Sequence, residues 1–150
     1  MDYQQAKELH HLLFSFAGLF HEKFMLRIRN EYYAEKLPNL KKNHQKIMNL
    51  LYQKDQQTST ELGRKLDIEK GSLTLLIDQL VKWDLVTRTT DPDDRRKTLI
   101  SLTAKGKEQM DKVMDFYARK LNDFFKDIEP QTMQEFIKNL RYVVNFLEKM

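Results

Sequence analysis

The sequence predicts a mainly α-helical protein with one small β-hairpin in the second half of the chain. Through most of the 150 residues, apolar side chains recur every three or four positions, which is the spacing of helices. Between Val86 and Leu102 the pattern changes to alternation around an Asp-Pro turn, which is typical of two short strands. A capping box, Thr58-x-x-Glu61, marks the start of one helix.

Two helices are expected before the capping box. The first runs from near Tyr3 to about Tyr33, and Pro38 closes the loop after it. Its apolar stripe consists of Leu9, Leu13, Phe16, Phe20, Phe24 and Ile28. The second helix, around residues 41–54, has an apolar face wider than one neighbour would cover, made of Ile47, Met48, Leu50 and Leu51.

Two short helices follow, separated by a brief turn. The capping box opens the first of them, in which Leu62 and Leu66 are four residues apart. A turn at residues 67–70 leads into the second helix, whose apolar face consists of Leu73, Leu76, Ile77 and Leu80.

The hairpin comes directly after these helices. In its second strand Thr98, Ile100 and Leu102 lie on one side, and Leu99 and Ser101 lie on the other. Its Asp91-Pro92 turn holds the following arginines at the tip, where they do not contribute to a core and can reach a polyanion. Two short helices, a tight turn and a hairpin make a winged helix-turn-helix, a motif whose second helix enters the major groove of DNA.

Two long helices are expected after the hairpin. Glu129-Pro130 separates them, because proline is favourable at the start of a helix. The apolar residues of the first are Met110, Val113, Met114, Tyr117, Leu121, Phe124 and Phe125, and those of the last are Met133, Phe136, Ile137, Leu140, Val144 and Leu147. Long terminal helices with such wide faces cannot all pack on a small motif, so we expect a symmetric dimer to bury the remainder. The alternative is a monomeric helical bundle with a large core.

Composition excludes several classes of protein. A chain without cysteine has no disulfide, thiolate nucleophile or cysteine metal site. Only 4 glycines are present, with no phosphate-binding loop and no catalytic constellation, so we expect neither an enzyme nor a cofactor. The 4 histidines lack metal-ligand spacing, and no metal is expected. No apolar run could span a bilayer and the first residues lack the basic start of a signal peptide, so we expect a cytoplasmic protein without membrane contact.

Positive charge is concentrated in the middle of the chain. The net charge is only +4, but residues 41–107 hold 14 Lys and Arg against 9 Asp and Glu, an excess of +5. Residues 1–40 hold 5 against 5, and residues 108–150 hold 7 against 8. The excess therefore lies in the segment that carries the DNA-binding pattern, although a solvated surface can vary by this much.

Four segments stand at a fixed spacing between residues 59 and 106: Thr60-Glu61-Leu62, Glu69-Lys70-Gly71-Ser72-Leu73-Thr74, Asp94-x-Arg96 and Leu102-Thr103-x-Lys105-Gly106. In these segments and their spacing, residues 59–106 strongly resemble the MarR family of bacterial transcription regulators. The resemblance implies one protomer over residues 1–150, with a DNA-binding lobe at residues 40–106 and dimerisation helices at residues 1–36 and 107–150. It implies a homodimer that binds double-stranded DNA at a pseudo-palindromic operator and acts as a repressor.

The candidate DNA contacts lie on the exposed side of the second short helix and at the wing. They are Lys70, Ser72, Thr74, Leu75, Gln79, Asp94, Arg95, Arg96 and Lys97. Ser72 and Thr74 can bond phosphates or base edges, and Gln79 can make two hydrogen bonds to adenine. Leu75 can meet thymine methyl groups, or it is simply a fourth core residue. The family often has arginine where Leu75 and Gln79 stand, which favours an A/T-rich operator here.

The wing residues have roles that the resemblance implies. Arg96 matches the family arginine that enters the minor groove, Asp94 matches the acid that orients the wing, and Arg95 and Lys97 are expected on phosphates. A narrow A/T-rich minor groove attracts such an arginine. The alternative is that Asp94 and Arg96 form a surface ion pair that only stiffens the hairpin.

The family often binds small aromatic or acidic effectors between the dimer helices and the DNA-binding lobe. The matching walls in this chain are Phe16, Phe20, Leu40, His44 and Met48, which are otherwise read as core residues. An alternative function is a winged-helix module that binds protein instead of DNA. Among the residues on the exposed helix face, only Leu75 favours that alternative.

Overall fold

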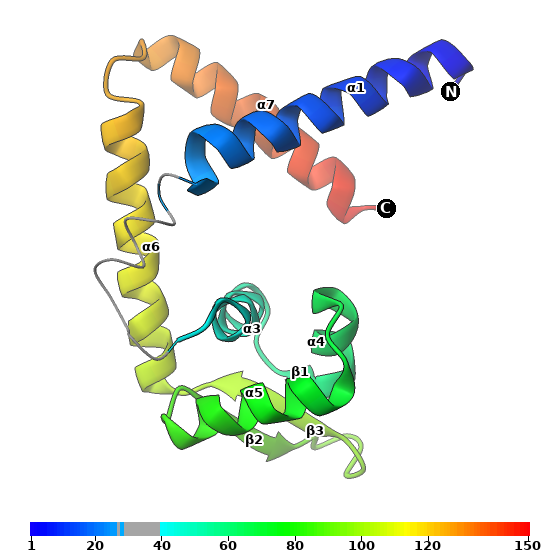
Figure 1. Cartoon of the computed structure of the whole chain (residues 1–150), viewed down its shortest axis with the longest axis vertical. Coiled ribbons are helices and arrows are strands. Elements are labelled where there is room, and N and C mark those ends of the chain that lie inside the picture. The colour runs from blue at the N-terminus through cyan, green and yellow to red at the C-terminus, as the bar shows by residue number, and fades with distance from the viewer. Residues whose placement is uncertain (27, 29–39) are drawn as a thin grey trace. The chain divides into compact units, whose positions relative to one another are not determined.

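The computed structural model describes residues 1–26, 28 and 40–150 (Figure 1). Its helices are α1 (Tyr3–Phe20), the π-helical turn η1 (His21–Met25), α3 (Lys42–Gln53), α4 (Ser59–Leu66), α5 (Lys70–Lys82), α6 (Ala104–Phe124) and α7 (Pro130–Glu148). Its strands are β1 (Gln57–Thr58), β2 (Val86–Thr90) and β3 (Thr98–Leu102). The predicted class, mainly helical with a small sheet, is confirmed. Two compact units, residues 1–116 and 117–150, divide the chain within α6.

The first helix begins where the sequence predicts. Asp2 caps it by accepting a hydrogen bond from the main-chain N–H of Gln5 at 2.8 Å, and the Gln5 side chain accepts one in return from the main chain of Asp2. The α-helical hydrogen bonding gives way to a π-helical turn at His21. The predicted end near Tyr33 and the loop closed by Pro38 lie outside the described residues.

A three-stranded antiparallel sheet supports the lobe, with the strand order β1-β3-β2. β2 and β3 form the predicted hairpin, in which Val86 pairs with Leu102 and Thr90 pairs with Thr98. β1 was not predicted, because two residues are too few to show an alternating pattern. It pairs Gln57 with Ile100 and places β3 in the middle of the sheet.

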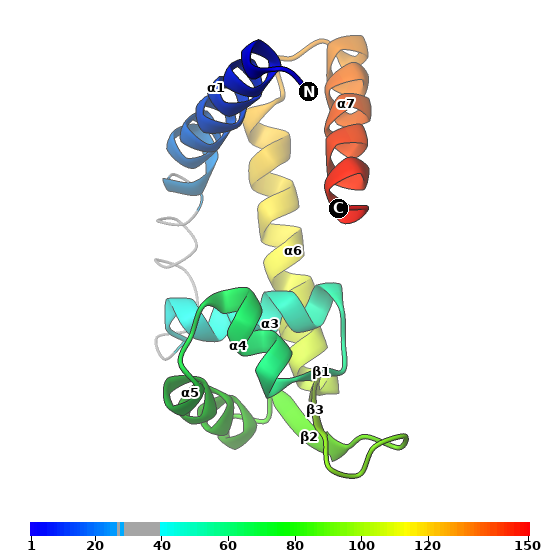
Figure 2. The ribbon, with the colours of Figure 1, turned by 90° about the vertical axis from the view of Figure 1, so that its right-hand side faces the viewer.

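The core of the lobe lies where α3, α4, α5 and the sheet meet (Figures 1 and 2). Most residues of the predicted apolar faces are buried there, with Leu50, Leu66 and Leu76 half-buried. The side chains with almost no exposed surface are Ile47, Met48, Leu51, Leu62, Leu73, Ile77, Leu80, Val86 and Ile100. This core fixes α5 and the hairpin in one lobe.

The capping box at the start of α4 is present as predicted. Thr58 Oγ1 accepts from the main-chain N–H of Glu61 at 3.2 Å, and the Glu61 carboxylate accepts from the main-chain N–H of Thr58 at 2.8 Å. The main-chain N–H of Thr58, and then the Thr58 hydroxyl, which donates to the same carboxylate at 2.8 Å, hold the pKa of Glu61 below its ordinary value. Asp67 ends the helix in the left-handed conformation, with φ at 51°, and so makes the tight turn into α5.

Hydrogen bonds join the start of α6 to the segment between α5 and β2. The Leu85 carbonyl accepts a hydrogen bond from the Thr103 N–H at 3.1 Å, and Thr103 Oγ1 donates to the Asp84 carbonyl at 2.7 Å. A Cβ atom on Gly106 would lie 2.0 Å from the Leu85 carbonyl oxygen, so only glycine allows this approach. The sequence Leu102-Thr103-x-Lys105-Gly106 therefore joins the sheet to the base of α6.

The terminal helices present apolar side chains that the single chain does not bury. α1 and α7 contain no buried residue. The exposed apolar residues of α7 include Phe136, Ile137, Leu140, Val143, Val144, Phe146 and Leu147. Among the described residues, no helix combines the length and the apolar character that crossing a membrane requires.

Candidate nucleic-acid interface

One side of α5 is anchored in the core and the other is open to solvent. Leu73, Ile77 and Leu80 are buried, whereas Ser72 and Thr74 are exposed. The Thr74 hydroxyl donates to the Lys70 carbonyl one turn earlier at 2.9 Å, so its oxygen remains as an acceptor. The exposed side therefore offers small polar groups on a helix that the core holds in place.

Leu75 does not belong to the core. Its side chain is 66% exposed, so the alternative interpretation as a fourth core residue is wrong. An exposed leucine in this position offers an apolar contact to a partner, whether a thymine methyl group or a protein surface.

Gln79 is exposed, but its side chain is already engaged by the lobe. Its Oε1 lies 2.8 Å from Nε2 of His44, a completely buried side chain on α3. The hydrogen bond joins residues 35 positions apart, which is why no pattern in the sequence indicates it. Any contact of Gln79 with DNA would therefore be made by a side chain that also contacts His44.

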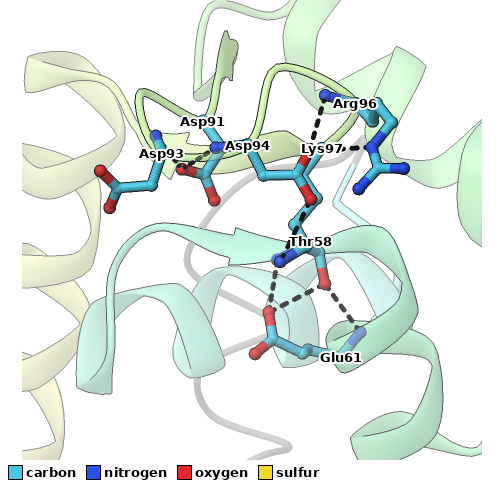
Figure 3. A network of polar contacts seen from close by, with 7 residues as sticks. All are labelled: Thr58, Glu61, Asp91, Asp93, Asp94, Arg96 and Lys97. Atoms are coloured by element: carbon cyan, nitrogen blue, oxygen red, sulfur yellow. Dashed lines mark hydrogen bonds and ion pairs between the residues drawn. The ribbon is translucent and has the colours of Figure 1, made fainter.

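The wing tip is organised by two carboxylates (Figure 3). Asp91 Oδ1 accepts from the main-chain N–H groups of Asp93 at 2.9 Å and Asp94 at 3.3 Å, which forms the turn after β2. Asp94 Oδ1 accepts from both the main-chain N–H and the Nε of Arg96 at 3.2 Å. Lys97 Nζ lies 3.6 Å from the other oxygen of Asp94. The loop projects from the end of the sheet (Figure 2).

The hydrogen bond from the main chain of Arg96 and then the contact with its side chain lower the pKa of Asp94. The carboxylate is therefore ionised and can orient the wing. The Arg96 side chain itself remains 92% exposed. Because the arginine of this pair lies in solvent while Asp94 is half-buried, the pair contributes little to stability, and Arg96 can exchange Asp94 for another anion at low cost.

Another ion pair joins α5 to the hairpin and was not predicted. Arg88 Nη1 of β2 lies 2.6 Å from Asp78 Oδ1 of α5. The sequence shows Arg88 only as the polar position of an alternating strand. The pair links the two elements that carry the candidate DNA contacts.

The candidate effector residues lie in two kinds of environment. Phe16 and Phe20 are exposed on α1, with their rings stacked at 5.8 Å between centroids. His44 and Met48 are completely buried in the lobe and Leu40 is almost so, which agrees with the interpretation of these three as core residues. A ligand can reach His44 or Met48 only if the core opens.

Acidification is expected to destabilise the lobe through His44. Burial is the main cause that lowers the pKa of this imidazole from its ordinary value near 6.5, and the charge of Lys41 adds to it. The unfolded state then binds more protons, so the free energy of unfolding is largest above about pH 6.5 and decreases as the pH falls through that value toward the folded pKa.

This pH dependence is measured by urea unfolding at pH 7.5 and 5.5. His44→Phe should reduce the difference between the two values, whereas His11→Phe, at an exposed position of α1, should retain it. An equal loss of stability on acidification in the chain with His44 and in His44→Phe would contradict the assignment.

Comparison with known proteins identifies relatives of this lobe. The model described as the MarR family matches residues 40–98. YkoM of Bacillus subtilis, named as an HTH-type transcriptional regulator, is 30% identical over 95 residues, which cover 63% of this chain and 62% of YkoM. The B. subtilis repressor YetL is 29% identical over 120 residues, covering 79% of this chain and 71% of YetL. The match thus spans less than two thirds of the length of YkoM.

Solved structures share the fold over nearly the whole chain. A MarR family protein from Bacillus stearothermophilus aligns with a TM-score of 0.73 at 21% identity, over 99% of both chains. A mutant MarR from E. coli aligns with a TM-score of 0.65 at 23% identity, over 85% of this chain and 95% of that one. At these identities the likeness establishes the fold alone.

Proposed function

From the match of residues 40–98 to the MarR family we propose that the chain is a member of this family, a sequence-specific transcription regulator that binds double-stranded DNA as a homodimer. The observation that carries the proposal is the lobe itself. It fixes α5 by a buried face, presents Ser72 and Thr74 on the open side, and holds Arg96 on an exposed wing. These are the groups that major-groove and minor-groove contacts require.

The homodimer is supported by the apolar surface of the terminal helices. α1 and α7 bury no side chain within one protomer, although each carries a wide apolar stripe. A second copy supplies the same apolar surface in return, as a two-fold symmetric interface requires. Two recognition helices in such a dimer would bind a pseudo-palindromic operator.

The proposed mode of action is repression. A dimer that occupies an A/T-rich promoter excludes polymerase, and a small aromatic or acidic effector would release it by favouring a different arrangement of the lobes. The exposed aromatic residues Phe16 and Phe20 offer the surface to which such a molecule could bind.

The exposure of Leu75 favours a second candidate function. A winged-helix module that binds protein needs an apolar contact on α5, and Leu75 supplies one. The neighbouring Ser72 and Thr74 do not fit an apolar interface, which is why DNA binding is preferred.

Arg96→Ala is expected to weaken operator binding by about 1–3 kcal/mol, because it removes an arginine from the minor groove. The melting temperature should not change, since the Arg96 side chain is 92% exposed and contributes nothing to the core. Fluorescence anisotropy at fixed salt, with an operator obtained by selection from random duplex DNA, measures the change.

Arg119→Ala is the matched control. It removes the same charge from an exposed position of α6, outside the lobe, and should leave operator affinity unchanged. If Arg96→Ala binds the operator with unchanged affinity, the minor-groove contact is wrong and Arg96 only forms a surface ion pair with Asp94.

A further inference from the structure

The amide of Gln79 is held at one end by a buried histidine. His44 Nε2 lies 2.8 Å from Gln79 Oε1, and the ring of His44 meets Trp83 edge-on at 5.0 Å between centroids. His44 has no exposed surface, whereas Gln79 is exposed on α5. Gln79 also lies seven residues after Ser72, which places both on one stripe of the helix. A core residue thus holds one end of a side chain on the candidate recognition face.

The hydrogen bonds of His44 determine which end of the amide it holds. The main-chain N–H of Lys41 donates to Nδ1 at 3.1 Å, so Nδ1 carries no proton. Burial keeps the ring neutral, with its pKa below the ordinary value, and the single proton therefore lies on Nε2. This N–H needs an acceptor, and among the described residues its partner is the oxygen of Gln79. The amino group of Gln79 can donate two hydrogen bonds and accept none, and it is left to donate to an external partner.

We propose that His44 is a positioning residue for base recognition, which turns the amino group of Gln79 toward the major groove. Gln79 then donates a hydrogen bond to bases that present an acceptor there, and it disfavours cytosine. The inference rests on the proposed function, in which α5 enters that groove. Adenine and guanine offer N7, guanine also offers O6, and thymine offers O4, whereas cytosine presents its N4 amino group.

The reverse orientation of the amide is disfavoured by the core. If Gln79 flipped, its amino group would face the Nε2–H of His44 and a buried donor would lose its acceptor. That loss disfavours the flipped state by roughly ten- to a hundredfold. Without His44 the amide could present its oxygen to cytosine as readily as its amino group to the other bases.

Selection from a pool of duplex DNA with a randomised centre tests this inference with the full chain at fixed salt. Gln79→Ala first identifies the base position that Gln79 contacts, as the one where preference is lost. At that position the chain with His44 should select against cytosine by about tenfold, and His44→Phe should abolish this selection while the other positions keep theirs.

Two variants restore or invert the effect. His44→Gln supplies an amide N–H near the place of Nε2 and should restore the rejection of cytosine. Gln79→Glu keeps an oxygen for His44 but offers an acceptor to the groove, so cytosine should become the preferred base. Tyr52→Phe, which removes a hydrogen bond from α3 to Asp111 instead, is the control and should leave every preference unchanged.

A measurement without DNA tests the hydrogen bond itself. Nitrogen-15 NMR of the His44 ring should show a protonated Nε2 and a bare Nδ1, and the side-chain amide signals of Gln79 should shift in His44→Phe but not in Tyr52→Phe. A proton on Nδ1 would overturn the inference. Thermal melts accompany each variant, and if His44→Phe does not fold, the Gln79→Glu result decides.

The outcomes separate the two proposals. If the chain binds no duplex DNA in this selection, the proposed function is wrong, and so is the inference that rests on it. If duplex is retained but a folded His44→Phe still rejects cytosine, or Gln79→Ala alters no position, the inference alone is wrong.

Discussion

A chain that ends at Pro130 is expected to be unfolded or to aggregate. The truncation removes nearly all of α7 and with it the apolar surface of Phe136, Ile137, Leu140 and Val144, which would otherwise cover the same kind of surface on a second protomer. The exposed apolar side chains of α1 would then lose their proposed cover as well. Light scattering coupled to size exclusion should show a dimer of 18.1 kDa protomers for the whole chain and no compact species for the truncation.

Deletion of Lys149 and Met150 is the matched control, because α7 ends at Glu148 and remains whole. This shorter deletion should preserve both the dimer and the circular dichroism of the full chain. A soluble, compact monomer from the chain that ends at Pro130 would disprove dimerisation through the terminal helices.

Affinity for duplex DNA is expected to fall on the order of a thousandfold between 50 and 200 mM salt. Lys70, Arg95 and Lys97 and their counterparts in the second protomer would neutralise about six phosphates while Arg96 enters the minor groove, and each phosphate contact releases bound counterions. The logarithm of affinity should therefore decrease linearly with the logarithm of salt concentration, with a slope near −5. Anisotropy titrations at four salt concentrations provide the measurement.

The same titration distinguishes the two candidate functions. Lys97→Ala in both protomers would remove two phosphate contacts and should make the slope shallower by about 2. A winged helix that binds protein through Leu75 would bind no duplex at either salt concentration. Weak DNA binding that does not vary with salt would refute the regulator proposal.

Local patterns in the sequence predict most of the lobe. The Thr58 and Glu61 capping box and the alternation along β3 depend on neighbours within a few residues, and both are confirmed. The apolar spacing of α5 likewise identifies its buried face. Such features can be predicted because the chain near each residue determines its environment.

Features that depend on distant partners could not be predicted. β1 consists of two residues and exists through its pairing with β3 some 40 positions later. The hydrogen bond between His44 and Gln79 and the ion pair between Asp78 and Arg88 likewise require the folded lobe. For the candidate site, the sequence identifies the residues on α5 and the wing. It does not show which of their polar atoms already form hydrogen bonds within the protein.

The close approach of Gly106 to the Leu85 carbonyl affects how the lobe exchanges its amide hydrogens. The Thr103 N–H donates to that carbonyl and the Gly106 N–H to Thr103 Oγ1, so we expect these amides to exchange slowly, through openings that break the contact between the start of α6 and the segment before β2. At the wing tip the main-chain N–H groups of Asp93 and Arg96 donate to the half-buried carboxylates of Asp91 and Asp94 within the same short loop, so we expect small local openings to release them. Hydrogen exchange is therefore expected to be slow at the base of α6 and fast at the wing tip, which would let the tip adjust to a DNA groove while the rest of the fold stays as it is.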